Sequence, residues 1–457
     1  MNGVPLEPDG DAVRALTEEA LEYLVAFTEG RRDRPASDFT GLDEALARVR
    51  TDPPEEGRPL ADVLDTVAAA GRVGHDTTGD GWMAYVPGGG LFTSALADLV
   101  AKTQNRFVNL WEPAPVAAEL EATAVRWLCG LFDLPPEARG TLTTGGSLAT
   151  FSAIVTARHA KLGEDFLDGT IYVTTETHGA TAKAAALAGF RRANVRVVPT
   201  TPELRMDVDA LREAVAADPR PCMVVATAGT TNTGAVDDLG ALADAAAELG
   251  LWLHVDAAYG GFFQLTERGR ERFTGIERAD SIVLDPHKGM FLPYGTGAVL
   301  VRDGRQLRAA HEVHGDYLQD LSDEAEIPDF ANYSAELSRD PRGLRVWLPI
   351  MLHGLGAFRA ALDEKLDLAR FLHDELRAIP GVEVPWEPEL SIVCFRCADD
   401  AATAALLDYI NGSGRVYLSS TQVNGRMTIR ACILSVHTHR DRVEELVELV
   451  RAGRRPG

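Results

Sequence analysis

Short apolar runs rich in β-branched residues alternate with Ala- and Leu-rich stretches between residues 140 and 302. The runs are typical of buried strands, whereas Leu239, Leu242, Ala246 and Leu249 recur at the three- and four-residue spacing of an amphipathic helix. Alternation of this kind predicts crossover connections and a mostly parallel sheet with helices on both faces, which is an α/β fold. We expect strands at residues 141–144, 171–174, 195–198, 223–227, 251–256, 282–285 and 298–301.

Residues 1–80 show a different pattern, because they are helical and charged and contain no predicted strand. One apolar stripe runs along this segment, and the segment has no sheet of its own to cover. The stripe consists of Leu16, Ala20, Leu21, Leu24 and Val25. We therefore expect residues 1–80 to pack on a partner subunit or on another part of the protein.

The C-terminal third of the chain is predicted to form a smaller unit. Residues 303–345 are polar and irregular, and a long helical pattern follows from Leu348 to Leu376. Strands are expected at residues 390–395 and 427–433, and helices at residues 401–410 and 440–451. The chain is thus expected to comprise an N-terminal helical segment (1–80), a large domain (81–345) and a small C-terminal α+β domain (346–457).

The composition is that of an ordinary globular protein, with 457 residues of which 46% are hydrophobic and 25% charged. Asp and Glu number 68 against 45 Lys and Arg, so the net charge of −23 repels phosphate backbones and we expect no nucleic-acid partner. No apolar run approaches the ~18 residues of a membrane helix, and the N-terminus has no secretory signal. The five cysteines are scattered. These features together predict a soluble, cytoplasmic protein.

Two side chains suited to catalysis, a carboxylate and an amine, lie at or just after the ends of predicted strands. Asp256 ends an apolar strand before the small residues Ala257 and Ala258, and Lys288 closes the run Asp285-Pro286-His287-Lys288 after another strand. The carboxyl ends of parallel strands lie at one edge of a sheet, so we expect Asp256 and Lys288 to meet there. A lysine just past a buried strand end is suited to a lowered pKa and to Schiff-base chemistry. Each residue taken alone is equally typical of an ordinary loop or helix cap.

Three further segments lie beyond predicted strands. Gly145-Gly146-Ser147 stands between a strand and a helix, where free N–H groups can bind a phosphate. His178 and Thr227 follow two other strands. A phosphate site, an Asp and a Lys at one sheet edge are what bound pyridoxal phosphate requires.

From about Trp82 to His439, the order of these motifs resembles the fold-type-I pyridoxal-phosphate decarboxylases that include the aromatic-L-amino-acid and glutamate decarboxylases. The His287-Lys288 pair and the Asp256 motif carry the resemblance, and residues 115–121 and 229–235 support it. The resemblance implies a homodimer with a shared active site, pyridoxal 5'-phosphate as cofactor and no metal. It also implies that the protein decarboxylates an L-α-amino acid.

The resemblance assigns roles to individual residues. Lys288 is similar to the Schiff-base lysine, Asp256 to the partner of the pyridinium nitrogen, and His178 to the histidine that stacks on the cofactor. The remaining assignments are Gly146 and Ser147 for the phosphate, Thr227 and Ala258 for the ring, and His287 for organising substrate and cofactor. Tyr85, Pro87 and Gly88 resemble the family's substrate-side segment.

The chain departs from the family pattern at several positions. Gly289 replaces a common Trp, and together with the run Gly88-Gly89-Gly90 it predicts a roomy pocket. Ser338-Arg339-Asp340 replaces a pair of arginines, and Leu148 replaces a Glu of the phosphate loop. Arg430 could contact a substrate carboxylate, although a decarboxylase gains little by binding the group that it expels.

The most informative departure concerns the family's catalytic loop tyrosine, which by counting back from Arg339 falls on Phe330. A phenol there would return a proton to Cα after CO₂ loss, and phenylalanine has no proton to give. An O₂-dependent decarboxylation that yields an aldehyde is therefore an alternative function, as in the family's aldehyde synthases. A shifted alignment would instead let Tyr333 or Tyr317 supply the phenol. A β-eliminating lyase or an aminotransferase on the same scaffold is a further alternative.

Overall fold

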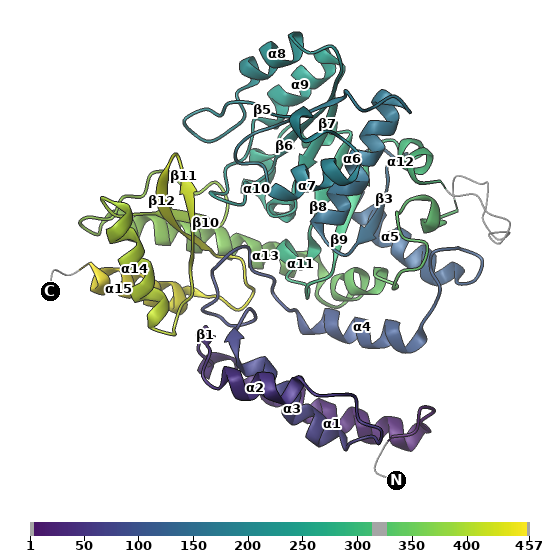
Figure 1. The fold of residues 1–457 in the computed structure, drawn as a ribbon, viewed down its shortest axis with the longest axis vertical. Helices are drawn as coiled ribbons and strands as arrows, with labels where there is room; N and C mark the ends of the chain where they lie inside the picture. Colours follow the sequence, from purple (N-terminus) through teal and green to yellow (C-terminus); the bar gives the residue numbers. More distant parts are fainter. Residues whose placement is uncertain (1–3, 313–326, 455–457) are drawn as a thin grey trace.

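The computed structural model describes residues 4–312 and 327–454. A seven-stranded sheet with the order β3-β9-β8-β7-β6-β4-β5 forms the centre of the large domain (Figure 1). Its strands are β3 (Arg139–Thr143), β4 (Thr170–Val173), β5 (Val195–Val197), β6 (Pro221–Thr227), β7 (Trp252–Asp256), β8 (Ser281–Leu284) and β9 (Gly297–Val301). β9 runs antiparallel to both of its neighbours, and the other neighbouring strands are parallel. The predicted α/β fold with a mostly parallel sheet is confirmed.

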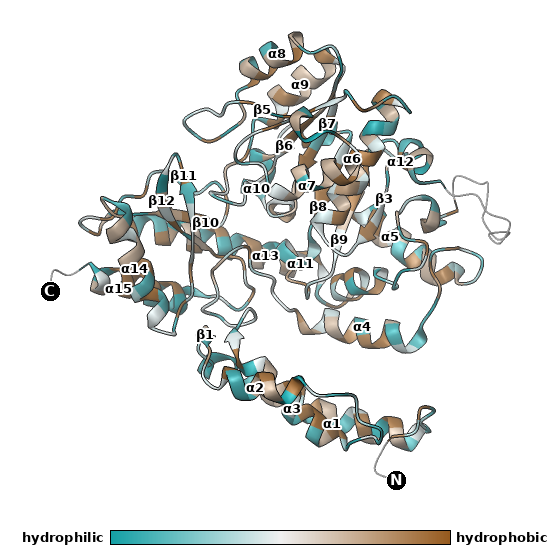
Figure 2. Ribbon diagram, in the orientation of Figure 1, coloured by the Kyte–Doolittle hydropathy of each residue, from teal (hydrophilic) through white to brown (hydrophobic). Residues whose placement is uncertain are grey.

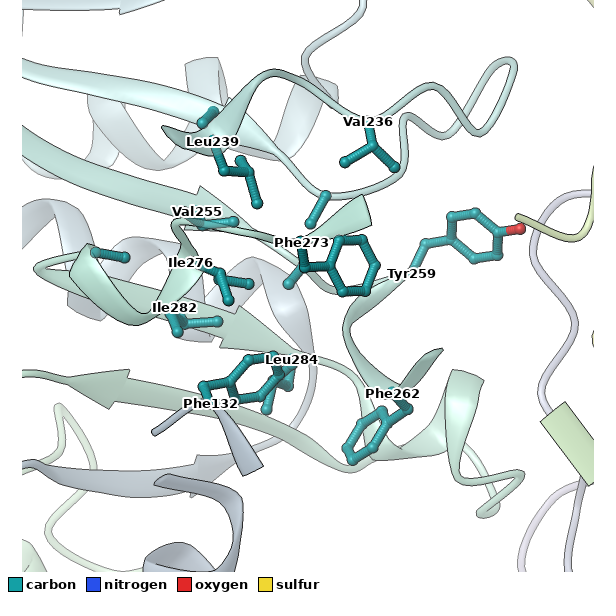
Figure 3. Close-up of a cluster of buried hydrophobic side chains, with 14 of the residues drawn as sticks. Phe132, Val236, Leu239, Val255, Tyr259, Phe262, Phe273, Ile276, Ile282 and Leu284 are labelled. Atoms are coloured by element: carbon teal, nitrogen blue, oxygen red, sulfur yellow. The ribbon is translucent and has the colours of Figure 1, made fainter. Parts of the chain in front are cut away.

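Side chains of the strands alternate between two apolar clusters on the opposite faces of the sheet. On β8, Ile282 and Leu284 belong to one cluster and Val283 to the other. Figure 3 shows part of the first cluster, where Ile282 and Leu284 lie beside Phe132. The helices of the large domain are α4 (Phe92–Gln104), α5 (Pro115–Leu131), α6 (Gly146–Leu162), α7 (Gly179–Leu187), α8 (Val208–Ala216), α9 (Leu239–Leu249), α10 (Glu267–Arg272), α11 (Pro286–Gly289) and α12 (Gly304–His311).

The small C-terminal domain has an antiparallel sheet with the order β10-β12-β11. The long helix α13 (Gly343–Arg377), which is kinked at Gly354, leads into it from the large domain. Its other elements are β10 (Ile392–Phe395), α14 (Asp400–Gly412), β11 (Ser419–Val423), β12 (Arg426–Cys432) and α15 (Arg440–Gly453). The strand β11 was not predicted, because its sequence is polar and its side chains are mostly half-buried or exposed.

An N-terminal arm (residues 4–72) projects from the body of the molecule (Figure 1). Its helices are α1 (Gly10–Glu29), α2 (Leu42–Val49) and α3 (Leu60–Arg72), and none of them contains a buried residue. Apolar side chains remain exposed along the arm, among them Leu21, Leu24 and Val25, and Figure 2 shows apolar residues on all three helices. The two-residue strands β1 (Ser37–Asp38) and β2 (Gly74–His75) were not predicted.

None of the helices in the described ranges combines the length and the apolar character needed to cross a membrane.

Candidate active site

A cavity of about 300 Å³ lies beyond the carboxyl ends of the parallel strands. Asp256 at the end of β7 and Lys288 on α11 both line it, as the order of the strands predicted. The other lining residues are Thr144, Gly145, Gly146, Ser147, Leu148, Thr150, His178, Ala180, Thr227, Gly229, Thr231, Ala258, Tyr259, Asp285 and His287. A cavity of this size with converging polar groups is typical of a small-molecule site.

Lys288 forms an ion pair inside the cavity. Its Nζ lies 2.9 Å from Oδ2 of Asp285, whose side chain is almost completely buried. Burial alone would lower the pKa of Lys288, but attraction to Asp285 and to Asp256 outweighs it and raises the pKa above the usual value. This direction is opposite to the predicted lowering of the pKa. One helical turn brings Asp285 back onto Lys288, which the sequence analysis did not consider.

His287 is held as a neutral imidazole. Its Nδ1 lies 2.7 Å from the carbonyl oxygen of Thr296, and only a protonated Nδ1 can donate to a carbonyl. Burial lowers the pKa of His287. Its Nε2 therefore carries a free electron pair, and this atom lies 3.7 Å from Oδ2 of Asp285.

Asp256 is fixed by the chain that follows it. The N–H of Ala258 donates to Oδ1 of Asp256 at 3.1 Å, and the strand pairing sets Thr227 of β6 beside Asp256. The N–H of Thr227 in turn donates to the buried Asp237 at 2.7 Å. Burial raises the pKa of Asp237 to about 6. A second carboxylate thus secures the strand end next to Asp256.

The backbone at Gly145 and Gly146 forms an anion-binding cradle. The N–H groups of Leu148 and Ala149 already donate to the carbonyl of Gly145, and those of Gly146 and Ser147 come first in α6, where a helix offers no acceptor. A Cβ on Gly146 would stand 3.0 Å from Oδ2 of Asp285 and 3.4 Å from Cβ of Ala258, so a side chain here would crowd both residues at the cavity wall. The free N–H groups fit the phosphate of the cofactor implied by the sequence.

His178 caps helix α7 at the mouth of the cavity. Its Nδ1 accepts the N–H of Ala180 at 3.2 Å, so the proton of the neutral ring is on Nε2. The ring is exposed in this chain and lines the cavity. The cap fixes both the orientation and the tautomer of the imidazole.

The structure does not bring Phe330 into this cavity. Phe330 on η5 (Phe330–Asn332) is 2% exposed, and the guanidinium of Arg339 lies 4.7 Å above its ring. Phe330 and Tyr333 line a second, separate cavity of about 150 Å³. Arg339 pairs at 2.6 Å with the buried Glu121, which holds the segment in place. Tyr317, the third candidate for the loop phenol, lies outside the described residues.

None of the predicted substrate-side residues lines the cavity, and Gly88 packs against its wall. A Cβ on Gly88 would stand 2.9 Å from the carbonyl oxygen of His287, so Gly88 packs directly on the lysine-bearing segment. Pro87 is buried, and Tyr85 is 62% exposed with its N–H bonded to Oγ of Ser419 at 3.1 Å.

The glycines that led us to expect a roomy or reshaped pocket pack closely against their neighbours. A Cβ on Gly289 would stand 2.7 Å from Cβ of Phe262, and the backbone and side chain of Phe291 occupy the corresponding space at Gly89. The glycines therefore permit close packing and leave no empty volume. Asp340, which stands where the family has an arginine, also has its charge neutralised. Its carboxylate pairs with Lys102 at 3.0 Å and with Arg342 at 2.9 Å.

Arg430 supports the cavity from the small domain and does not line it. Its guanidinium donates to the carbonyl of Thr231 at 2.7 Å, to the carbonyl of Asn232 at 3.2 Å and to Oγ of Ser419 at 3.0 Å. Arg430 is 3% exposed, and its nitrogens hold the loop that contains Gly229 and Thr231. Each of the three nitrogens thus donates to a protein acceptor, which argues against a role in binding a substrate carboxylate.

Tyr259 is another cavity residue that the sequence analysis missed. Its ring belongs to the first apolar cluster (Figure 3), and its hydroxyl lies 2.8 Å from Oγ of Ser391 in the small domain. The only sequence signal for Tyr259 was its place in the segment after Asp256.

The described residues include no cluster of three or more potential metal ligands, and all five cysteines within them are buried and unpaired.

Comparison with known proteins places these features in context. Residues 49–398 match the family model described as the pyridoxal-dependent decarboxylase conserved domain. An aromatic-L-amino-acid decarboxylase of Bacillus atrophaeus is 30% identical over 98% of this chain and 96% of its own. A phenylacetaldehyde synthase of Arabidopsis thaliana is 26% identical, with 98% and 97% covered. The crystal structure of Oryza sativa TDC with PLP and tryptamine matches at a TM-score of 0.93 and 27% identity, covering 98% of this chain and 99% of that one.

Proposed function

The chain belongs to the pyridoxal-dependent decarboxylase family, and from this premise we propose that its cavity removes the α-carboxylate of an L-α-amino acid. The observation that carries the proposal is the convergence of Lys288, Asp256 and the Gly146–Ser147 cradle on one cavity. Pyridoxal 5'-phosphate is the cofactor of the family.

We assign the binding of the cofactor to residues already placed in the cavity. Lys288 would bond to its aldehyde, Gly146 and Ser147 would hold its phosphate, and the side chains of His178, Thr227 and Ala258 would contact its ring. The bound cofactor supplies an electron sink for the pair that remains at Cα when CO₂ leaves. The chain's task is to hold the scissile bond in the reactive orientation.

Asp256 makes the largest electrostatic contribution in this assignment. Its carboxylate is fixed by the N–H of Ala258 and would keep a proton on the ring nitrogen. A charge pair near 4 Å at an effective dielectric of about 20 is worth roughly 4 kcal/mol. His287 is neutral with a free electron pair on Nε2, so it can accept a hydrogen bond beside Lys288.

The amine is the product that the site supports best. The aldehyde alternative depended on Phe330, and this side chain is buried in the second cavity. Because one relative is named phenylacetaldehyde synthase, the test below also measures aldehyde and O₂ uptake. Tyr85, Pro87 and Gly88 remain our assignment for the substrate side, because Gly88 packs on His287.

We also propose a homodimer in which the N-terminal arm packs on the partner subunit and both subunits shape each active site. The three helices of the arm contain no buried residue and expose apolar side chains. Apolar surface of this extent is typical of an interface. We accordingly divide the chain into three units: residues 1–80, which contain the arm, residues 81–345 and residues 346–457. Static light scattering should give twice the chain mass, and a monomer at micromolar concentration would refute the dimer.

One experiment tests the function. The full-length protein is loaded with pyridoxal phosphate and its visible absorbance is compared with that of Lys288→Ala. A panel of L-amino acids, beginning with aromatic ones because of the relatives' names, is then scored for CO₂, amine, aldehyde, O₂ uptake and peroxide. CO₂ with an equal amount of amine supports the proposal. Aldehyde with O₂ uptake selects the alternative, and the absence of CO₂ with every substrate rejects both.

A further inference from the structure

Asp285 occupies a position that the proposed function leaves without a role. It caps α11 at the end of β8 and is 2% exposed. Its Oδ2 lies 2.9 Å from Nζ of Lys288 and 3.7 Å from Nε2 of His287. The carboxylate therefore contacts the amine that must react.

The same carboxylate also faces the phosphate cradle. A Cβ on Gly146 would stand 3.0 Å from Oδ2 and 3.4 Å from Cγ of Asp285. The second oxygen, Oδ1, is buried and has no hydrogen-bond partner among the described residues. A buried carboxylate oxygen without a partner is costly, and a phosphate oxygen at the cradle would be the nearest new partner.

The charges around Asp285 change when the cofactor binds. Lys288 is the one lysine or arginine among the described residues that line the cavity, and it pairs with Asp285. The other histidines and carboxylates that line the cavity are His287 on the same helix, Asp256 at the end of β7 and His178 at the start of α7, whereas α6 contributes Ser147 and Thr150 but no ionisable side chain. A phosphate in the cradle would then leave two like charges facing each other in a buried site, which favours protonation of the carboxylate.

We propose that Asp285 accepts the proton that Lys288 gives up when it bonds to the cofactor, and that Asp285 then stays a neutral acid which donates a hydrogen bond to the phosphate. An N–H bond of the Lys288 ammonium breaks and an O–H bond forms on Asp285. The neutral amine would then condense with the aldehyde carbon of the cofactor, and the aldehyde oxygen would leave as water with the two protons that remain on the lysine nitrogen. Asp285 thus couples the charge of the lysine to the occupancy of the cradle. This inference rests on the proposed function.

Infrared difference spectroscopy of the full-length protein before and after addition of pyridoxal phosphate tests where the proton lies. We expect a carbonyl band of a protonated carboxylic acid to appear on loading at pH 8, which is above the pKa of about 6 of the buried Asp237. The band should be absent in Asp285→Asn and in Asp285→Ser, and it should remain in Asp256→Asn. A loaded wild type without the band, or a band that survives both Asp285 variants, would overturn the proposal.

The second test measures the free amine of Lys288 in the cofactor-free protein. Reductive methylation with formaldehyde at a series of pH values is quantified for the Lys288 peptide by mass spectrometry. Asp285→Asn should move the half-labelling pH of Lys288 downward by about one unit or more, because burial then acts against a weaker attraction. Lys365, which is buried and paired with Glu364 at 2.9 Å, is the internal reference and should not move. An unchanged midpoint at Lys288 would contradict the coupling.

Different results would reject the proposed function and the role of Asp285. A wild type without cofactor absorbance rejects the proposed function. A wild type that shows the absorbance but fails either test rejects only the role of Asp285. Circular dichroism of each variant checks that it folds.

Discussion

The ring of Phe262 occupies the space that a side chain at position 289 would need. A Cβ on Gly289 would stand 2.7 Å from Cβ and 3.1 Å from Cδ2 of Phe262. Phe262 lies on η3 (Gly261–Leu265) and is fully buried in the first apolar cluster (Figure 3). The pair packs the helix that carries Lys288 tightly against the segment that follows Asp256.

Substitution of Gly289 by Ala tests this packing. We expect Gly289→Ala to lower the free energy of unfolding by about 1–3 kcal/mol, because the added methyl group meets a Cβ that cannot rotate away. In a Phe262→Gly background the same substitution should cost less, since both the Cβ and the ring are gone. Urea denaturation of the four proteins gives the double-mutant cycle, and strictly additive effects would refute the contact.

Asp256→Asn should reduce kcat/KM by about three powers of ten. The estimate follows from the roughly 4 kcal/mol that a close charge pair contributes at an effective dielectric of about 20. Steady-state kinetics with the best substrate of the panel measure the loss. Cofactor absorbance should persist, which separates weakened chemistry from weakened binding. A loss of kcat/KM below tenfold would show that Asp256 does not keep the proton on the ring nitrogen of the cofactor.

Phe330→Tyr should leave the ratio of amine to aldehyde unchanged. The ring is buried under Arg339, and the added hydroxyl would lie in the second cavity, away from Lys288. The measurement is product analysis with one substrate. Tyr317→Phe is the contrasting variant, because Tyr317 is the remaining candidate for the phenol, and it should raise the aldehyde fraction. A shift toward amine in Phe330→Tyr would restore the original alignment.

Arg430→Lys should weaken the binding of pyridoxal phosphate by about tenfold. A lysine cannot replace the bonds to Thr231 and Asn232, and the loop that lines the cavity then loses buried hydrogen bonds worth about 1 kcal/mol each. Titration of the cofactor absorbance measures the change. Arg426→Lys, on the same strand but paired with the partly exposed Glu383, is the matched control and should bind normally. Equal affinities in both variants would exclude the supporting role.

His254 should make the stability of the protein depend on pH. Burial lowers the pKa of His254 to about 4, from 6.5 in an unfolded chain. Between pH 4 and pH 6.5 the unfolded state therefore binds more protons than the folded state. Stability contributed by neutral His254 is therefore present at neutral pH and falls on acidification, by about 2 kcal/mol from pH 7 to pH 5. Urea unfolding of the wild type and of His254→Asn isolates this contribution. Parallel pH profiles for the two proteins would contradict it.

The position of the site was predictable because strand order determines it. Parallel strands deliver the residues that follow them to one edge, so Asp256 and Lys288 had to meet once the α/β pattern was recognised. The boundaries of β5 and β7 fell within one residue of the prediction.

Features that depend on which neighbour fills a space were not predictable. The role of Gly289 is understood only from the position of Phe262, and the charge of Lys288 only from the orientation of Asp285. The three bonds of Arg430 join segments distant in sequence, which no local pattern encodes. The burial of Phe330 likewise depends on the long-range pair between Arg339 and Glu121.

The place of Arg430 on β12 has a consequence for biosynthesis. β12 is the last strand of the described chain, and Arg430 on it holds the loop at Thr231. During translation the lysine, the aspartate and the phosphate cradle leave the ribosome well before this support exists. The nascent large domain can therefore form its sheet early, whereas the loop at Thr231 gains this support only after β12 has been synthesised, so the final shaping of the cavity wall is a late maturation step of the polypeptide.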